Sequence, residues 1–162
     1  DLSEIEKLDL TIDGADEFDT NYDLIKGGGG ALTREKIVAL ASNSMIVVAD
    51  DRKKVSTLGQ FPLPVEVSVS NWEEVKEKIS NICPGKVNLR MENENPFVTD
   101  NGGYILDCNF GSIISKPDIY EKKINSIEGV IEVGLFVGIC DVVIFSSLSG
   151  IQTLIKPNGR IS

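Results

Sequence analysis

Several residues that can transfer protons or bind anions lie close together near the start of the sequence. The segment from Asp13 to Asp16 places two carboxylates directly after an apolar stretch. Lys26 then precedes four consecutive glycines, Gly27 to Gly30, and Glu35 follows shortly after them. Carboxylates, a lysine and a run of accessible backbone amides suit proton transfer on a small phosphorylated polyol without a metal. The same carboxylates could instead hold Mg²⁺, and the residue types leave both options open.

Each of these groups also has a plain structural interpretation. Aspartates after a strand often cap the amides of a turn, and consecutive glycines are typical of a flexible loop. A glutamate in the first turn of a helix complements the helix dipole. In the functional interpretation, the glycine amides and the helix N-terminus bind an anion, and burial of Glu35 raises its pKa for work as a general base. Lys53 or Lys54, after the following strand, would add a positive charge, although lone lysines of this kind are usually solvated.

The elements that must position these groups form a βαβ unit. Residues 8–12 predict a short buried strand, and a helix is predicted after the glycines because Ile37, Leu40 and Ala41 fall at i, i+3 and i+4. Residues 45–49 are apolar without alternation, which is typical of a parallel strand covered on both faces. Ligands of such open sheets bind at the carboxyl ends of the strands, where Asp13 and Asp16 would lie.

The pattern changes after residues 60–64, where two prolines favour an extended linker. Val65, Val67 and Val69 alternate with polar residues and predict a half-exposed strand. From there to residue 136 the order is β-α-β-β-α-β, with a hairpin turn at residues 100–103, which matches a ferredoxin-like unit. Residues 141–146 and 151–155 predict two strands that return to the first sheet. We therefore expect an α/β fold with a Rossmann-like parallel-sheet domain (residues 1–62 and 137–162) and a smaller ferredoxin-like α+β domain (residues 63–136).

Composition removes several classes of function. The net charge of −9 and the absence of a basic run disfavour general binding to nucleic acid or to an anionic membrane. The chain has no histidine, which excludes His-based triads and His-ligated zinc. Cys83, Cys108 and Cys140 are far apart and lack a CxxC motif, so we expect buried core thiols in a reducing compartment rather than a catalytic thiol. No apolar stretch is long enough for a membrane span.

Three segments together carry a family resemblance. They are Asp9-Leu10-Thr11-Ile12-Asp13-Gly14-Ala15-Asp16-Glu17, Leu24-Ile25-Lys26-Gly27-Gly28-Gly29 and Ala31-Leu32-Thr33-Arg34-Glu35-Lys36. In this order they closely resemble the A-type ribose-5-phosphate isomerases, and shorter segments at residues 61–67, 98–102 and 134–136 extend the likeness over nearly the whole chain. Any one of the three segments alone would be a weak signal, but the combination is highly specific.

The resemblance implies an aldose-ketose isomerase of the non-oxidative pentose phosphate pathway. Such an enzyme interconverts D-ribose 5-phosphate and D-ribulose 5-phosphate through an enediolate, with neither a metal nor an organic cofactor. Glu35 would be the base that moves the proton between C1 and C2, with Asp13, Asp16 and Lys26 as the other catalytic residues. The implied substrate-binding residues are Asp13, Gly14, Ala15, Asp16, Lys26, Gly27, Gly28, Gly29 and Lys53. The resemblance further implies a cytoplasmic homodimer or homotetramer that binds a small sugar phosphate, with no nucleic acid and no membrane as partner.

Two other interpretations stay open beside the enzyme. The sugar-phosphate-sensing domains of some bacterial repressors resemble this fold and bind without turnover, but the intact Glu35 beside both aspartates and Lys26 favours the enzyme. The second interpretation is an inactive fragment that serves only as a folded scaffold. Members of the family begin with a further segment that carries a Thr/Ser/Gly phosphate-binding loop. We therefore expect this chain, lacking the N-terminal part of the large domain, to be a partial view of a longer enzyme, with weak phosphate affinity and poor solubility or activity on its own.

Overall fold

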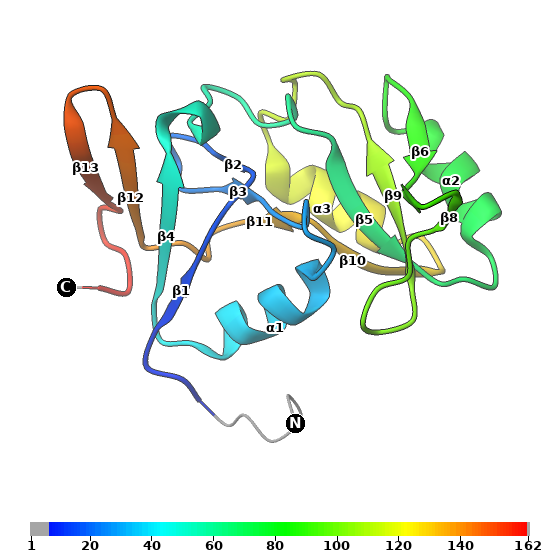
Figure 1. The fold of residues 1–162 in the computed structure, drawn as a ribbon, viewed down its shortest axis with the longest axis horizontal. Helices are drawn as coiled ribbons and strands as arrows, with labels where there is room; N and C mark the ends of the chain where they lie inside the picture. Colours follow the sequence, from blue (N-terminus) through cyan, green and yellow to red (C-terminus); the bar gives the residue numbers. More distant parts are fainter. Residues whose placement is uncertain (1–6, 162) are drawn as a thin grey trace.

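The computed structural model describes residues 7–161, which form an elongated molecule built from four β-sheets (Figure 1). At one end lies a sheet in the order β1 (Thr11–Asp13), β4 (Met45–Asp50), β12 (Val142–Ser147), β13 (Gly150–Ile155). The first three strands are parallel, and β13 pairs antiparallel with β12. Helix α1 (Leu32–Ala41) lies in the chain between the parallel neighbours β1 and β4, which confirms the expected βαβ unit, and β12 and β13 are the two expected returning strands.

This first sheet buries only one of its faces among the described residues. Met45 and Val47 of β4 are fully buried against the core, whereas Val48 on the opposite face is 50% exposed. The expectation that residues 45–49 are covered on both faces is therefore wrong, because α1 and the short strands β2 and β3 pack on one side only. The first strand also begins later than expected, at Thr11, and Leu8 forms an isolated bridge with Ser42.

Helix α1 turns a different face to the core from the one that its apolar residues predict. Ile37 and Leu40 are 43% and 63% exposed, whereas Leu32, Lys36 and Ala39 are buried. Lys36 can point inward because its ammonium group donates to Glu121, Glu132 and the carbonyl oxygen of Val133, at 2.7–2.8 Å. A fully compensated charge thus takes the place of an aliphatic side chain in the interior.

A small sheet connects the two halves of the molecule. It has the order β11 (Leu135–Phe136), β3 (Leu24–Ile25), β2 (Glu17–Phe18), and all pairs are antiparallel. Successive side chains of a strand point to opposite faces. Accordingly, Leu24 and Phe136 lie in the core under the first sheet, and Ile25 and Leu135 lie in the core of the other half. The segment between β1 and α1 therefore contributes two strands to this sheet.

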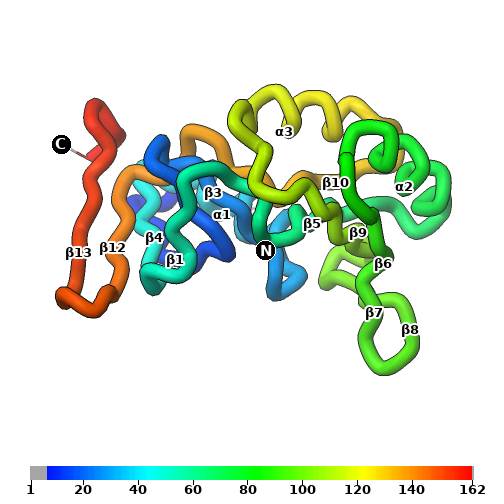
Figure 2. Tube along the Cα trace, turned by 90° about the horizontal axis from the view of Figure 1, so that it is seen from above, coloured from blue at the N-terminus to red at the C-terminus, as the bar shows by residue number. Residues whose placement is uncertain are grey.

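The other half has the expected ferredoxin-like order. Its sheet runs β10 (Val130–Val133), β5 (Leu63–Val67), β9 (Tyr104–Cys108), β6 (Val87–Leu89), with antiparallel neighbours throughout. Helices α2 (Trp72–Ser80) and α3 (Pro117–Asn125) lie on the same side of this sheet (Figure 2). A hairpin of β7 (Met91–Glu92) and β8 (Asn95–Pro96), which the sequence analysis missed, projects on the opposite side.

Strand β5 differs from its prediction in burial and in position. It is buried along its whole length because α2 and α3 cover one of its faces and α1 contacts the other, so the half-exposed strand expected from the alternating valines is wrong. It begins at Leu63, so Pro64 lies within the strand rather than in a linker. Strand β5 belongs to a different sheet from β4, but the domain boundaries after residues 62 and 136 stay a prediction.

The remaining features concern membranes and thiols. Within residues 7–161 no helix has the length and apolar character needed to cross a membrane. Cys83, Cys108 and Cys140 are all free and buried, as expected. Burial raises the pKa of each thiol, and for Cys140 the pKa rises to about 11.

The buried Lys36 contact generates a prediction about stability. Lys36→Met removes the cation between Glu121 and Glu132 and leaves two poorly solvated carboxylates side by side, so we expect the free energy of unfolding to fall by about 3–5 kcal/mol. Urea denaturation followed by tryptophan fluorescence measures this change. Lys78→Met is the matched control, because Lys78 pairs with Glu74 on the exposed surface of α2 and should leave the midpoint unchanged. Equal midpoints for the two variants would contradict the assignment.

Candidate active site

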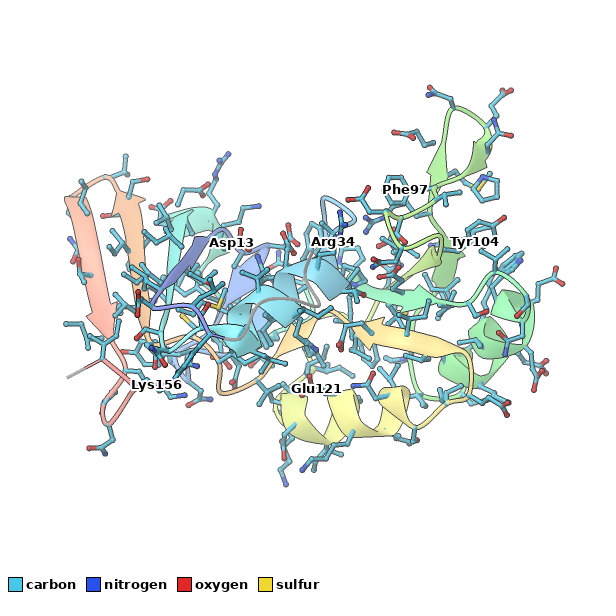
Figure 3. The ribbon with its side chains drawn as sticks, turned by 90° about the horizontal axis from the view of Figure 1, so that it is seen from below. Asp13, Arg34, Phe97, Tyr104, Glu121 and Lys156 are labelled. Atoms are coloured by element: carbon cyan, nitrogen blue, oxygen red, sulfur yellow. The ribbon has the colours of Figure 1, made fainter. Side chains whose placement is uncertain are left out.

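Of the ten predicted site residues, all except Lys53 line one pocket. The pocket has a volume of about 220 Å³ and lies where β1 and β3 end and α1 begins. Its lining is Asp13, Gly14, Ala15, Asp16, Lys26, Gly27, Gly28, Gly29 and Glu35. Figure 3 labels Asp13 at the end of its strand and Arg34 on α1. The carboxyl ends of two strands and the N-terminus of a helix thus bring together residues from two separate segments of the chain.

Lys26 is the central charge of this pocket. Its side chain is only 3% exposed, and its ammonium group lies 2.9 Å from Asp13 Oδ2 and 3.6 Å from Glu35 Oε2. It also donates to the carbonyl oxygen of Gly14 at 2.6 Å, and it lies 5.5 Å from the centre of the Phe136 ring. Because Lys26 immediately follows β3, the small connecting sheet fixes its backbone. The N–H of Lys26 donates to the carbonyl oxygen of Gly134, which follows β10.

Asp16 holds the glycine loop from the other side. Its Oδ2 accepts a hydrogen bond of 2.7 Å from the N–H of Gly28. A Cβ atom on Gly28 would come within 2.5 Å of Asp16 Oδ1, so only glycine allows the carboxylate to approach this closely. Gly27 has a φ of +107°, a left-handed conformation that also favours glycine. The glycine run is therefore an ordered loop packed around a carboxylate.

Glu35 faces the pocket from the first turn of α1. Burial raises the pKa of its carboxyl group, and the nearby Asp13 adds to this effect, while the Lys26 ammonium opposes it. Glu35 Oε2 is buried and has no hydrogen-bond partner among the described residues. The first turn of the helix is fixed to the other half of the molecule through Thr33, whose hydroxyl donates to the buried carboxylate of Glu66. Glu35 is thus a carboxylate on a firmly held helix end, and its Oε2 accepts no hydrogen bond within the described residues although the Lys26 ammonium lies 3.6 Å away.

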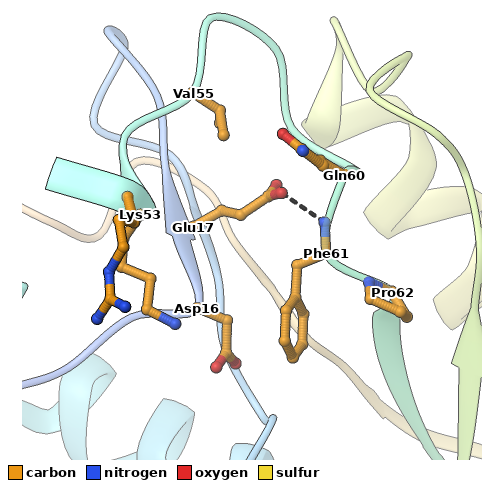
Figure 4. A pocket seen from close by; sticks show the side chains of 8 residues that line it. Asp16, Glu17, Lys53, Val55, Gln60, Phe61 and Pro62 are labelled. Carbon is orange, nitrogen blue, oxygen red and sulfur yellow. Dashed lines mark hydrogen bonds between the residues drawn. The ribbon is translucent and has the colours of Figure 1, made fainter. Parts of the chain in front are cut away.

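Lys53 lies in a neighbouring hollow rather than in the pocket of the other predicted residues. This hollow has a volume of about 400 Å³ and is lined by Asp16, Glu17, Arg52, Lys53, Val55, Gln60, Phe61 and Pro62 (Figure 4). Asp16 lines both spaces, so the two are adjacent. Glu17 shapes the hollow, because its carboxylate accepts the N–H groups of Gly59 and Phe61 and so fixes that loop. Lys53 is therefore next to the pocket, and Asp16 is the residue that the hollow and the pocket share.

One residue at the pocket was missed by the sequence analysis. Arg90, which lies between β6 and β7, donates from Nη1 to the carbonyl oxygens of Gly27 and Gly28 at 3.0 Å each. No motif around Arg90 marks it, and more than sixty positions separate it from the glycines. Only the pairing of sheets could bring these residues together.

The carboxylates of the pocket face donors rather than a shared space for a metal ion. Asp13 contacts Lys26, and Asp16 accepts the Gly28 amide. Over residues 7–161 no three acidic or cysteine side chains form a group that could hold a metal ion. The arrangement offers a free carboxylate oxygen, a buried ammonium group and a loop of amides around a space of sugar size, which suits proton transfer on a small polar molecule.

Comparisons with known proteins agree on one family. The family model described as ribose 5-phosphate isomerase A (phosphoriboisomerase A) matches residues 1–150. The ribose-5-phosphate isomerase A of Bacillus mycoides is 46% identical over 152 residues, which cover 93% of this chain and 68% of that protein. Ribose-5-phosphate isomerase A 1 of Oceanobacillus iheyensis is 51% identical over 145 residues, which cover 89% of this chain and 63% of that protein.

Solved structures show the same relationship. A D-ribose-5-phosphate isomerase in complex with phospho-erythronic acid superimposes with a TM-score of 0.89 at 41% identity, over 95% of this chain and 68% of that one. The ribose 5-phosphate isomerase of Plasmodium falciparum has a TM-score of 0.90 at 36% identity, over 94% of this chain and 68% of that one. The chain thus spans roughly two thirds of the length of its relatives, and as little as 59% for one of them. On its sequence and on its fold, the chain belongs to the ribose 5-phosphate isomerase A family.

Proposed function

We propose that the pocket around Lys26 is the catalytic site of an aldose-ketose isomerase that interconverts D-ribose 5-phosphate and D-ribulose 5-phosphate. The observation that carries the proposal is Glu35 Oε2, a buried carboxylate oxygen without a hydrogen-bond partner among the described residues, at the wall of a pocket with a lysine and a glycine loop. Membership in the family and the sugar-acid phosphate bound to one related structure support the same substrate class.

The reaction moves one proton between neighbouring carbons. The Glu35 carboxylate would take the proton from C2 of the open-chain aldose and return it to C1 of the enediolate, while a proton passes from the C2 hydroxyl to the C1 oxygen, which yields the ketose. A free carboxylate oxygen is needed for this, because a carboxylate already occupied by donors is a weaker base. Burial supports the role because it raises the pKa of Glu35, which makes its ionised carboxylate a stronger base.

Negative charge develops on the substrate oxygens in the enediolate, and the other pocket residues would stabilise it. The Lys26 ammonium lies within the pocket, and the Gly27, Gly28 and Gly29 backbone provides polar groups along its wall. Donors that are fixed before the reaction stabilise such charge most effectively. Asp13 would keep Lys26 protonated and oriented, and Asp16 would bind substrate hydroxyls while it holds Gly28. Lys53 would contact the substrate from the adjacent hollow.

We further infer that the protein works in the cytoplasm as a homodimer or homotetramer. Three free, buried cysteines support a reducing compartment. Strand β13 lies at the edge of its sheet and exposes Ile151 and Ile155, which favours coverage by a second copy. Analytical ultracentrifugation of the protein tests the assembly.

The role of Glu35 predicts the effect of Glu35→Gln. The amide keeps the shape of the side chain but cannot accept the proton, so we expect kcat to fall by about 10²–10⁴-fold with a smaller change in KM. Formation of ribulose 5-phosphate from ribose 5-phosphate measures the rate. Glu73→Gln on α2, outside the pocket, is the matched control. A near-normal kcat for Glu35→Gln would return Glu35 to a role in complementing the helix dipole.

The raised pKa of Glu35 also predicts how activity depends on pH on the acidic side. Glu35 must be ionised to act as a base, so activity should fall as the pH drops through its raised pKa, at a higher pH than an ordinary glutamate would allow. Asp13 raises this pKa and Lys26 lowers it. In a ¹³C NMR titration of the Glu35 carboxyl, Asp13→Asn should therefore lower the pKa and Lys26→Met should raise it. Shifts of the same sign in both variants would contradict this electrostatic assignment.

Metal independence is the third prediction from this site. The ammonium group and the loop amides can stabilise the enediolate without a Lewis acid. We expect the turnover of a complete chain to be unchanged after incubation with EDTA and dialysis. Loss of activity that Mg²⁺ or Zn²⁺ restores would show that a metal ion takes part.

A further inference from the structure

Arg90 links the smaller half of the molecule to the glycine loop. Its Nε and Nη2 donate to the two carboxylate oxygens of Asp107 at 2.9 and 2.6 Å, and its Nη1 reaches the carbonyl oxygens of Gly27 and Gly28 at 3.0 Å each. The guanidinium group therefore donates two hydrogen bonds to Asp107 on one side and two hydrogen bonds to the glycine loop on the other. Its side chain is only 16% exposed, so water competes little for these bonds.

The backbone around Arg90 is fixed as well. The N–H of Arg90 donates to the carbonyl oxygen of Ile105 in β9, and its own carbonyl oxygen accepts the N–H of Phe97. The Phe97 ring lies near the Arg90 guanidinium, 5.8 Å away, and packs against Gly30 at the end of the loop. Figure 3 shows Phe97 on the side of the smaller half, across from Arg34 on α1. Arg90 is thus a rigid support rather than a mobile surface side chain.

The consequence for the pocket follows from the geometry of the peptide unit. In a trans peptide the C=O and N–H bonds point in opposite directions. The carbonyl oxygen of Gly27 accepts from Arg90 and from the N–H of Gly30, and the N–H of the same unit, on Gly28, donates to Asp16 Oδ2 at 2.7 Å. One peptide plane is therefore fixed at both ends. The carbonyl oxygen of Gly28 is also held by Arg90, so the N–H of Gly29, which lines the pocket, points away from Arg90.

We propose that Arg90, oriented by Asp107, is a positioning residue of the pocket. By fixing the two glycine carbonyl groups, it aims the Gly28 amide at Asp16 and the Gly29 amide into the site. The charge of the guanidinium group also polarises these peptide units, which strengthens their N–H groups as donors. The ferredoxin-like half thereby contributes to catalysis without touching the substrate. The catalytic part of this inference rests on the proposed function, but the positioning part can be measured without any activity.

The chain offers a matched control. Arg34 of α1 and Asp100 form a second arginine–aspartate pair between the same two halves, at 2.9 Å, but neither touches the glycine loop. Arg34→Lys and Arg90→Lys therefore make the same chemical change to two links between the halves. A lysine keeps the positive charge but cannot bind Asp107 in bidentate fashion and hold two carbonyl oxygens at once. Asp107→Asn is a second variant, which leaves Arg90 in place and loosens its orientation.

The first measurement is hydrogen exchange of the Gly28 amide by NMR in the unliganded protein. Loss of a hydrogen bond to a charged group predicts exchange about 10–100-fold faster in Arg90→Lys, a smaller increase in Asp107→Asn, and no change in Arg34→Lys. Exchange of amides in α2 shows that each variant is folded. If Gly28 exchanges equally in Arg90→Lys and Arg34→Lys, the proposal is overturned.

The second measurement is turnover in a double-mutant cycle with Asp16→Asn. Because part of the proposed effect of Arg90 runs through the bond between Gly28 and Asp16, Arg90→Lys lowers kcat by about 10-fold or more in the parent protein but by a smaller factor when Asp16 is already replaced. Effects that multiply would reduce Arg90 to a structural contact and overturn the proposal. If turnover is absent even when the chain is extended by the N-terminal segment of its relatives, the proposed isomerase is refuted, whereas Gly28 exchange would still decide whether Arg90 positions the loop.

Discussion

The ammonium group of Lys26 is almost completely removed from water, and a charge in that position is stable only when nearby groups compensate it. Asp13 at the end of β1, the Gly14 carbonyl oxygen and Glu35 on α1 provide this compensation. Three separate elements must therefore meet at one point for the chain to fold. The requirement that stabilises Lys26 also assembles the pocket, so the architecture and the candidate chemistry share one electrostatic origin.

The connecting sheet explains how this point is held between the two halves. Strand β3 ends directly before Lys26, and its two residues point into different cores. The ring of Phe136, opposite Leu24 in the register of β11, has the Lys26 and Lys36 ammonium groups 5.5 and 5.1 Å from its centre. Two buried cations thus share one aromatic ring as part of their surroundings, which makes their burial less costly. The cores of the two halves therefore meet at this small sheet, one on each of its faces.

The pocket was accessible from the sequence because its residues lie in two short segments. Asp13 follows a strand, and Lys26, the glycines and Glu35 follow one another, so local patterns were sufficient to expect them at one sheet edge. Helices α2 and α3 could also be predicted, since each has an apolar stripe at helical spacing. The roles of the individual pocket residues stay proposals, because neither the geometry nor the relatives assign them residue by residue.

What the sequence could not reveal depends on distant partners. Lys36 looks like a surface residue until Glu121 and Glu132 are placed beside it, and this is why the wrong face of α1 was expected to be buried. The alternation in β5 suggested exposure, but Glu66 is buried with Thr33 and Thr99 as donors. A polar side chain is predicted outside whenever its compensating groups come from other elements. Arg90 was missed for the same reason, because its partners Asp107, Gly27 and Gly28 belong to other parts of the chain.

The three cysteines carry a chemical consequence of the way the cores are built. Oxidation by peroxide and modification by electrophiles both proceed through the thiolate, whose population falls as the thiol pKa rises. Cys83 and Cys108 lie in one core and Cys140 in the other, and burial raises the pKa of all three. The folded chain therefore keeps its three thiols unreactive under oxidative stress. Each thiol becomes reactive only when its own core opens, so thiol oxidation falls on molecules that have already begun to unfold.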